Sequence, residues 1–191
     1  MSQSIPYEIF VETFCKEAIS KFSSSAWGEV IKEEKILQDD KRIEWELFYL
    51  WVFLLTYCFQ RIFAYLGEEN IKIVLDGMHK AIYNPARHPD ISEEGLKGVH
   101  NIIVIRYAQY YKAIKSDWEI MEKGAKMLTF SVLVDSFILN LLNINIENFG
   151  SQGSHKFTKF KLKFGLIISY FCRDLLDWFE KFKAKYEIEF T

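Results

Sequence analysis

Apolar side chains recur every three or four residues over most of the chain, the spacing that places them on one face of an α-helix. The first such segment follows Pro6, whose fixed φ suits the first turn of a helix, and it extends to Phe22. A shorter segment surrounds Trp27 and Ile31. The pattern therefore predicts two helices in the first part of the chain.

The third apolar segment, from about 41 to 66, is the most hydrophobic. It follows Asp39 and Asp40, residues that can cap a helix, and Gly67 suits a left-handed C-terminal position. Its middle is apolar on every side, which is typical of a helix surrounded by other helices. Because the uninterrupted apolar stretch is only about 13 residues long and a spanning helix needs roughly 20, we expect a buried central helix and no transmembrane segment.

Polar residues divide the rest of the helical pattern. Asn70 is placed to cap a fourth helix, which would end before Pro85 because the residue preceding a proline avoids the helical region. A fifth helix is expected to begin near Ser92. Ser116-Asp-Trp-Glu119 matches a capping box and predicts that a sixth helix begins there and extends to about residue 143.

Residues 144–156 are rich in Gly, Ser and Asn, which predicts a flexible loop before a final helix over about 157–185. Residues 186–190 and 159–164 both alternate with period two, and their opposite charges would suit a pair of strands. We assign helix to 159–164 and leave the conformation of 186–191 open. The pattern as a whole predicts an all-α, single-domain bundle of six or seven helices over residues 1–191.

Composition agrees with one helical domain. The 191 residues are 50% hydrophobic, enough to bury a continuous core, and only 3 Pro and 9 Gly exclude a collagen-like or largely disordered chain. Aromatic residues reach 17%, and they recur at helical spacing, so we expect most of them in the core.

The cysteines indicate a reducing compartment. Cys15, Cys58 and Cys172 are isolated among apolar residues and show neither zinc-ligand nor redox spacing. An odd number of cysteines without a disulfide framework fits a reduced protein. The N-terminal residues also lack the basic and apolar runs of a secretory signal, so the sequence predicts buried thiols and a cytoplasmic location.

The net charge of −2 conceals an uneven distribution. Residues 156–185 carry eight basic and three acidic side chains, while the rest of the chain carries a net charge of −7. The near-neutral total argues against a dedicated nucleic-acid-binding protein, because affinity for phosphates depends on clustered Lys and Arg. A local basic surface remains an alternative to an ordinary solvated helix face, and its members would be Lys156, Lys159, Lys161 and Lys163.

Asp76 and His79, one helical turn apart, form the nearest approach to a metal-binding motif. His100 and either Glu44 or Glu46 would complete a metal site if the helices bring them together. The alternative is that these side chains simply occupy solvated helix flanks. Glu-x-x-His pairs, nucleophile elbows and phosphate-binding glycine loops are absent from the sequence, so we expect no cofactor.

Asp135 interrupts an otherwise apolar helical stretch. A buried carboxylate needs a partner, and Arg61 and Arg106 are comparable basic residues on apolar helices. The three residues would be the polar lining of a ligand pocket, or else they would form a structural ion pair.

The surplus of large apolar side chains over recognisable catalytic groups favours a non-enzymatic helical protein. Such a protein would bind a protein partner, another copy of itself or an apolar ligand through aromatic-rich surfaces. Two alternatives stay open: a metal-dependent enzyme built on Asp76, His79 and His100, and peripheral association with membranes or nucleic acid through residues 156–185.

Overall fold

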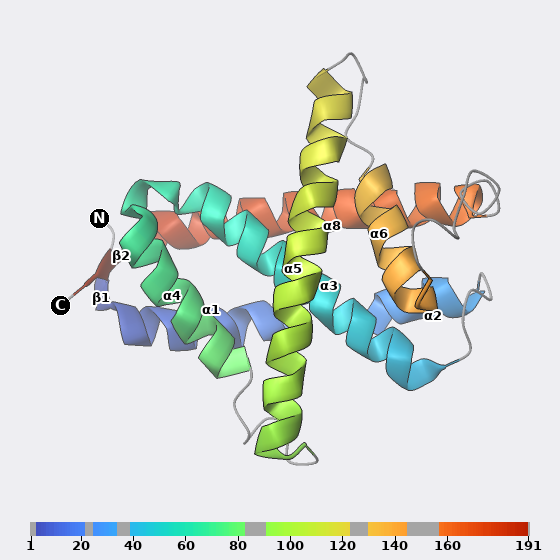
Figure 1. Ribbon diagram of the computed structural model, residues 1–191. Helices are drawn as coiled ribbons and strands as arrows, with labels where there is room; N and C mark the ends of the chain where they lie inside the picture. The colour runs from blue at the N-terminus through green and yellow to red at the C-terminus, as the bar shows by residue number, and fades with distance from the viewer. Residues whose placement is uncertain are drawn as a thin grey trace. The chain divides into compact units, whose positions relative to one another are not determined.

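The computed structural model describes residues 3–21, 25–33, 39–82, 91–122, 130–144 and 157–190. In these ranges the chain forms seven α-helices, one 3₁₀ turn and two short strands (Figure 1). The predicted all-α bundle of six or seven helices is confirmed. The elements are β1 (Gln3–Pro6), α1 (Tyr7–Lys21), α2 (Ser25–Glu33), α3 (Asp40–Ile62), η1 (Ala64–Leu66), α4 (Glu68–Ile82), α5 (Glu93–Glu122), α6 (Ser131–Leu142), α8 (Thr158–Lys185) and β2 (Tyr186–Glu189).

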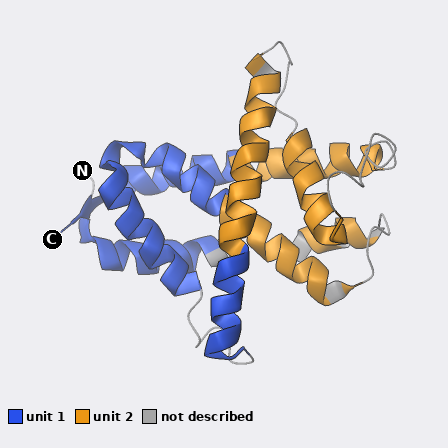
Figure 2. Cartoon of the chain, viewed as in Figure 1, with its two compact units in different colours: residues 1–23, 54–102, 173–191 blue, residues 24–53, 103–172 orange. Residues whose placement is uncertain are grey.

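The chain divides into two compact units (Figure 2). Unit 1 contains residues 1–23, 54–102 and 173–191, and unit 2 contains residues 24–53 and 103–172. Three of the four changes of unit fall inside helices, in α3, α5 and α8. The apolar pattern is continuous through these helices, which is why the sequence gives no sign of a boundary. Most of the predicted 144–156 loop lies outside the described residues.

The core of unit 1 is aromatic. Phe10 and Phe14, four residues apart, lie on one face of α1 and are completely buried. Phe14 packs against Phe59 of α3 at a ring-centroid distance of 5.5 Å and against Phe179 of α8 at 5.1 Å. Edge-to-face and stacked pairs alternate in this cluster, as ring quadrupoles favour. The aromatic surplus of the sequence is therefore used here for packing.

The two ends of unit 1 are joined by a parallel pair of strands. Ile5 of β1 lies opposite Ile188 of β2, and both are buried. The Ser4 hydroxyl donates a hydrogen bond to the Glu189 carboxylate. The alternation at 186–190 thus reflects a strand that pairs with β1, while residues 159–164 are helical, as predicted.

Unit 2 is built around the first half of α3. Phe53 is fully buried against Tyr110 of α5, with ring centroids 5.3 Å apart. Phe137 of α6 stacks on Phe164 of α8 at 5.1 Å, and Trp27 of α2 meets the same ring edge-on at 6.0 Å. Together these contacts close a second aromatic core.

None of the helices in the described ranges has an apolar stretch long enough to cross a bilayer.

Two predicted helix boundaries are wrong. α4 begins at Glu68, so Asn70 lies inside the helix, where its side-chain amide donates to the Leu66 carbonyl at 3.1 Å. α5 continues through Ser116, whose hydroxyl donates to the Lys112 carbonyl one turn earlier at 3.2 Å. A serine inside a helix can satisfy its hydroxyl by donating to the backbone carbonyl one turn earlier. A capping-box match alone therefore does not end a helix.

Asp117, which the sequence placed at the start of a helix, caps the separate helix α6 from inside α5. Its carboxylate, buried in unit 2, accepts the backbone N–H groups of Val132 at 2.9 Å and Leu133 at 3.0 Å. These are unsatisfied donors at the start of α6. Burial raises the pKa of Asp117, whereas the two backbone hydrogen bonds act in the opposite direction. α5 therefore supplies the N-terminal cap of α6 from a distance along the chain.

Gly67 follows η1 with φ 80° and ψ 159°. The positive φ agrees with the prediction, but this ψ lies outside the left-handed helical region, in a region that only glycine occupies readily. We expect Gly67→Ala to lower the free energy of unfolding by about 1–3 kcal/mol. Gly98, inside α5, is the matched control, because an added Cβ meets nothing within 4 Å there.

Gly98→Ala should raise the free energy of unfolding by about 0.5–1 kcal/mol, since alanine favours helix. Chemical denaturation of both variants measures the two changes. Equal effects of the two substitutions would contradict the conformation assigned to Gly67.

Candidate functional site

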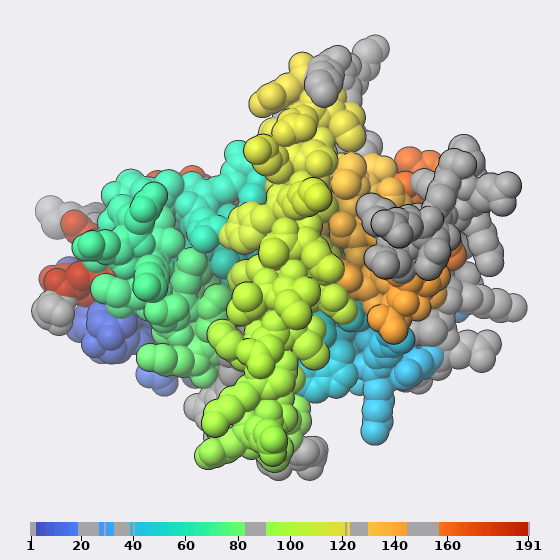
Figure 3. All heavy atoms as spheres, viewed as in Figure 1, coloured from blue at the N-terminus to red at the C-terminus, as the bar shows by residue number. Residues whose placement is uncertain are grey.

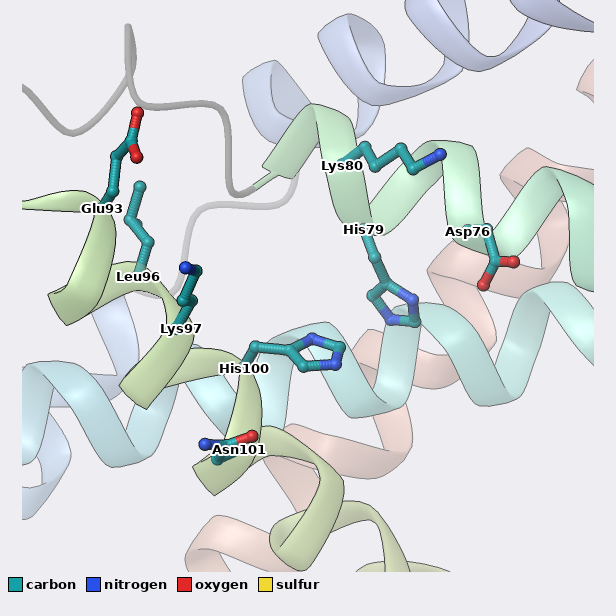
Figure 4. Close-up of a pocket in the computed structure, with 8 residues that line it drawn as sticks. All are labelled: Asp76, His79, Lys80, Glu93, Leu96, Lys97, His100 and Asn101. Carbon is teal, nitrogen blue, oxygen red and sulfur yellow. The ribbon is translucent and has the colours of Figure 1, made fainter.

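An open pocket of about 710 Å³ lies between α4 and the first turns of α5, within unit 1 (Figure 4). This volume is in the range of small-molecule sites. Residues spaced three or four apart line it from each helix, since that spacing places them on one face. The lining residues are Asp76, His79 and Lys80 of α4, and Glu93, Leu96, Lys97, His100 and Asn101 of α5.

The centre of the pocket is formed by two imidazoles. The rings of His79 and His100 project toward each other from the two helices, whereas Asp76 and Glu93 lie toward opposite ends of the pocket (Figure 4). Burial lowers the pKa of His79, and the charge of His100 lowers it further, while Asp76 acts in the opposite direction. The neutral form of His79 is therefore favoured.

The depressed pKa of His79 predicts how stability depends on pH. Between the unfolded value near 6.5 and the lower folded value, the unfolded chain binds the proton more readily. The contribution of His79 to the free energy of unfolding should therefore fall as the pH is lowered from about 7 through that window. Denaturation midpoints of the wild-type protein and His79→Gln, compared at several pH values, test this. The variant should show a shallower dependence, and an unchanged slope would contradict the prediction.

The structure gathers three of the five suggested metal ligands, Asp76, His79 and His100, around one pocket. Glu44 and Glu46 belong to unit 2. Across the described part of the chain, no group of three or more His, Cys, Asp or Glu side chains is arranged to hold a metal ion. The three residues therefore line one pocket without forming a coordination site in this conformation.

Glu46 is engaged by Arg106 within unit 2. The Arg106 Nε and Nη2 donate to the two carboxylate oxygens of Glu46 at 2.9 and 2.5 Å, a bidentate pair that joins α3 to α5. The two side chains are only 17% and 7% exposed. Burial raises the pKa of neighbouring Tyr49 to about 12, and the charge of Glu46 adds to this effect. The pair is a structural ion pair and leaves Glu46 no free oxygen.

Asp135 pairs with Lys161 of α8, with 2.7 Å between Oδ2 and Nζ, rather than with the two arginines that the sequence suggested. Arg106 binds Glu46, and Arg61 of unit 1 is exposed and donates to the Tyr57 hydroxyl at 3.2 Å. A small pocket of about 150 Å³ lies beside Lys161. The sequence missed this partner because Lys161 was assigned to a basic surface.

The predicted basic surface is smaller than expected. The Lys161 side chain is only 13% exposed, because it turns toward Asp135. Lys159 and Lys163 are exposed, and Lys156 lies outside the described residues. Of the members in the described ranges, Lys159 and Lys163, four residues apart, therefore lie on the exposed side of α8.

Beside these lysines, α8 carries an exposed apolar row. We use the name α8 row for Leu162, Leu166 and Tyr170, which are four residues apart and 60%, 42% and 55% exposed. α5 also has an uncovered face (Figure 3), and its Val104 and Ile105 are more than half exposed. These two α5 residues are adjacent in sequence, so they do not form a row along the helix. Most aromatic rings are buried, and exposed apolar side chains in the described ranges are chiefly aliphatic.

No family model, characterised protein or solved structure matches the chain. A functional proposal therefore depends on the chemistry of its surfaces.

Proposed function

We propose that the protein is a non-enzymatic binding protein that docks an acidic amphipathic helix of a partner protein on the α8 row. The observation that carries the proposal is the exposure of Leu162, Leu166 and Tyr170 at four-residue intervals, beside Lys159 and Lys163. We also propose a cytoplasmic location, for which the burial of all three cysteine thiols gives support.

The geometry of the row suits a helix. Side chains four residues apart form a ridge along a helix surface, and such ridges interdigitate with those of a second helix. From Leu162 to Tyr170 the ridge is about 12 Å long, at 1.5 Å per residue. A partner helix would cover this ridge with about two of its turns. Many proteins bind an amphipathic helix of a partner in this way.

The two lysines beside the row favour a partner of negative charge. Lys159 and Lys163 lie one turn apart on α8, and Lys163 is adjacent to Leu162 in sequence. Glu or Asp on the flanks of a partner helix would meet these ammonium groups, speeding association and excluding basic helices. Nucleic acid fits less well, because Tyr170 is the one aromatic ring in the row and the two leucines offer bases no stacking platform.

A helical peptide with Leu at every third or fourth position and Glu on its flanks is the probe, and fluorescence anisotropy is the measurement. We expect saturable binding that weakens as salt is raised, and a loss of at least about tenfold in Leu166→Glu, as for a central interface residue. The matched control is Ile73→Glu on α4, because Ile73 and Leu166 are both 42% exposed. It should bind like the wild type.

Equal losses in the two variants would contradict the proposal, as would an absence of binding. Vesicles of phosphatidylserine and a single-stranded oligonucleotide serve as competing probes. Binding to either that depends on Leu166, without peptide binding, would reassign the α8 row to a membrane or to nucleic acid.

A further inference from the structure

We propose that the pocket between α4 and α5 binds a small organic carboxylic acid, with its carboxylate between Lys97, His100 and Asn101 and its apolar body against Leu96. This site lies in unit 1, whereas the α8 row lies in unit 2. The inference is therefore independent of the proposed partner binding, and each can fail without the other.

The size and walls of the pocket suit an organic molecule. Its volume of about 710 Å³ accommodates a ring with substituents. Leu96 is buried at its wall, and the methylene stems of Lys80 and Lys97 provide further apolar surface below their charged ends. An inorganic ion alone would leave this apolar surface unfilled.

The polar groups of the pocket favour a ligand of negative charge. Lys97, His100 and Asn101 follow at intervals of three and one residues on α5, so their nitrogen groups lie on one face within a single turn. His79 faces them from α4 (Figure 4). All four offer N–H donors, and a carboxylate accepts several such bonds at once.

The two carboxylates of the pocket flank this cluster. Asp76 and Glu93 lie toward opposite ends of the pocket in Figure 4, with the two imidazoles between them. In the described part of the chain no ion pair joins Glu93 to Lys97, although the two residues are one turn apart on α5. The Lys97 ammonium is thus not neutralised by Glu93.

Six ionisable groups line the pocket: Asp76, His79, Lys80, Glu93, Lys97 and His100. Burial and the charge of His100 lower the pKa of His79, so its imidazole gains a proton only below its ordinary value near 6.5. Added positive charge at the centre strengthens the attraction for a carboxylate. Affinity should therefore rise as the pH is lowered through the range below about 6.5.

Benzoate is the probe, and benzamide, which has the same shape without the charge, is its control. Backbone-amide NMR titration of the full chain should show saturable shifts at α4 and the start of α5, with a Kd at or below about 1 mM for benzoate. Benzamide should bind at least about tenfold more weakly. Shifts that appear equally with both compounds would overturn the inference.

Two lysine variants keep the test specific. Lys97→Gln should weaken benzoate binding about tenfold, whereas Lys72→Gln on the exposed side of α4, outside the pocket lining, should leave it unchanged. Both residues are exposed, so neither substitution should disturb the fold, which circular dichroism checks. A carboxylate site would be contradicted by the absence of any shift up to about 10 mM benzoate, or by equal losses in the two variants. It would also be contradicted if zinc ions, and not benzoate, perturbed His79 and His100.

Discussion

Replacing Glu46 with glutamine is expected to lower the free energy of unfolding by about 3–5 kcal/mol. The glutamine side chain keeps the shape of glutamate but leaves the Arg106 guanidinium without its counter-charge. Arg106 is only 17% exposed, so water cannot replace the lost carboxylate fully. Removal of one partner of a buried pair costs more than the pair contributes, because the remaining charge stays buried and unpaired.

The double variant Glu46→Leu with Arg106→Met separates these two contributions. It removes both charges and keeps apolar volume, so it should lie within about 1 kcal/mol of the wild type or be more stable. Denaturant unfolding of the wild type and of single and double variants gives the comparison. A loss under about 1 kcal/mol in Glu46→Gln would be the behaviour of a surface pair and would contradict the buried geometry.

The second large effect is expected at Phe14. Truncation to alanine should cost about 3–5 kcal/mol, because a fully buried ring is removed and the cavity refills only partly. The ring contacts others from both α3 and α8, at centroid distances of 5.5 Å to Phe59, 5.2 Å to Trp178 and 5.1 Å to Phe179. These neighbours come from two parts of the sequence far from α1, so local repacking cannot close the gap.

Tyr65→Ala is the control for this substitution. Tyr65 is 58% exposed, and its ring has a cation–π contact with Lys183, whose Nζ lies 4.7 Å from the ring centroid, and a ring contact with Phe63 at 6.1 Å. Its loss should cost no more than about 1 kcal/mol. If the denaturation midpoint moves as far in Tyr65→Ala as in Phe14→Ala, the aromatic core assigned to unit 1 is wrong.

Helical periodicity was enough to predict the class of the fold. Apolar spacing identifies the face that each helix buries, and Phe10 with Phe14 shows how directly that spacing becomes a core. Helix ends were less predictable, because Ser116 and Asn70 have the residue types of caps and yet satisfy hydrogen bonds inside helices. Asp117 shows the converse, a cap that acts on a helix it does not belong to.

Contacts between segments far apart in the sequence could not be predicted from the sequence. Glu46 and Arg106 are 60 residues apart, and Asp135 and Lys161 are 26 apart, so no local spacing relates them. β1 and β2 come from opposite ends of the chain, which made the alternation at 186–190 uninterpretable alone. The pocket residues were easier to predict, since Asp76 and His79 stand out by their i,i+3 spacing. The packing of α4 beside α5 adds His100 to them.

Site-specific photo-crosslinking tests the proposed partner binding most directly. A photoreactive residue in place of Leu166, and in a second preparation in place of Ile73, is irradiated in extract of the source cells, and crosslinked peptides are sequenced. Position 166, but not position 73, should capture a segment with helical apolar spacing and acidic flanks, and Leu162→Glu should abolish the capture. Crosslinks from position 166 to lipid, to nucleic acid or to a second copy of the chain, or equal capture at both positions, would contradict the proposed partner binding.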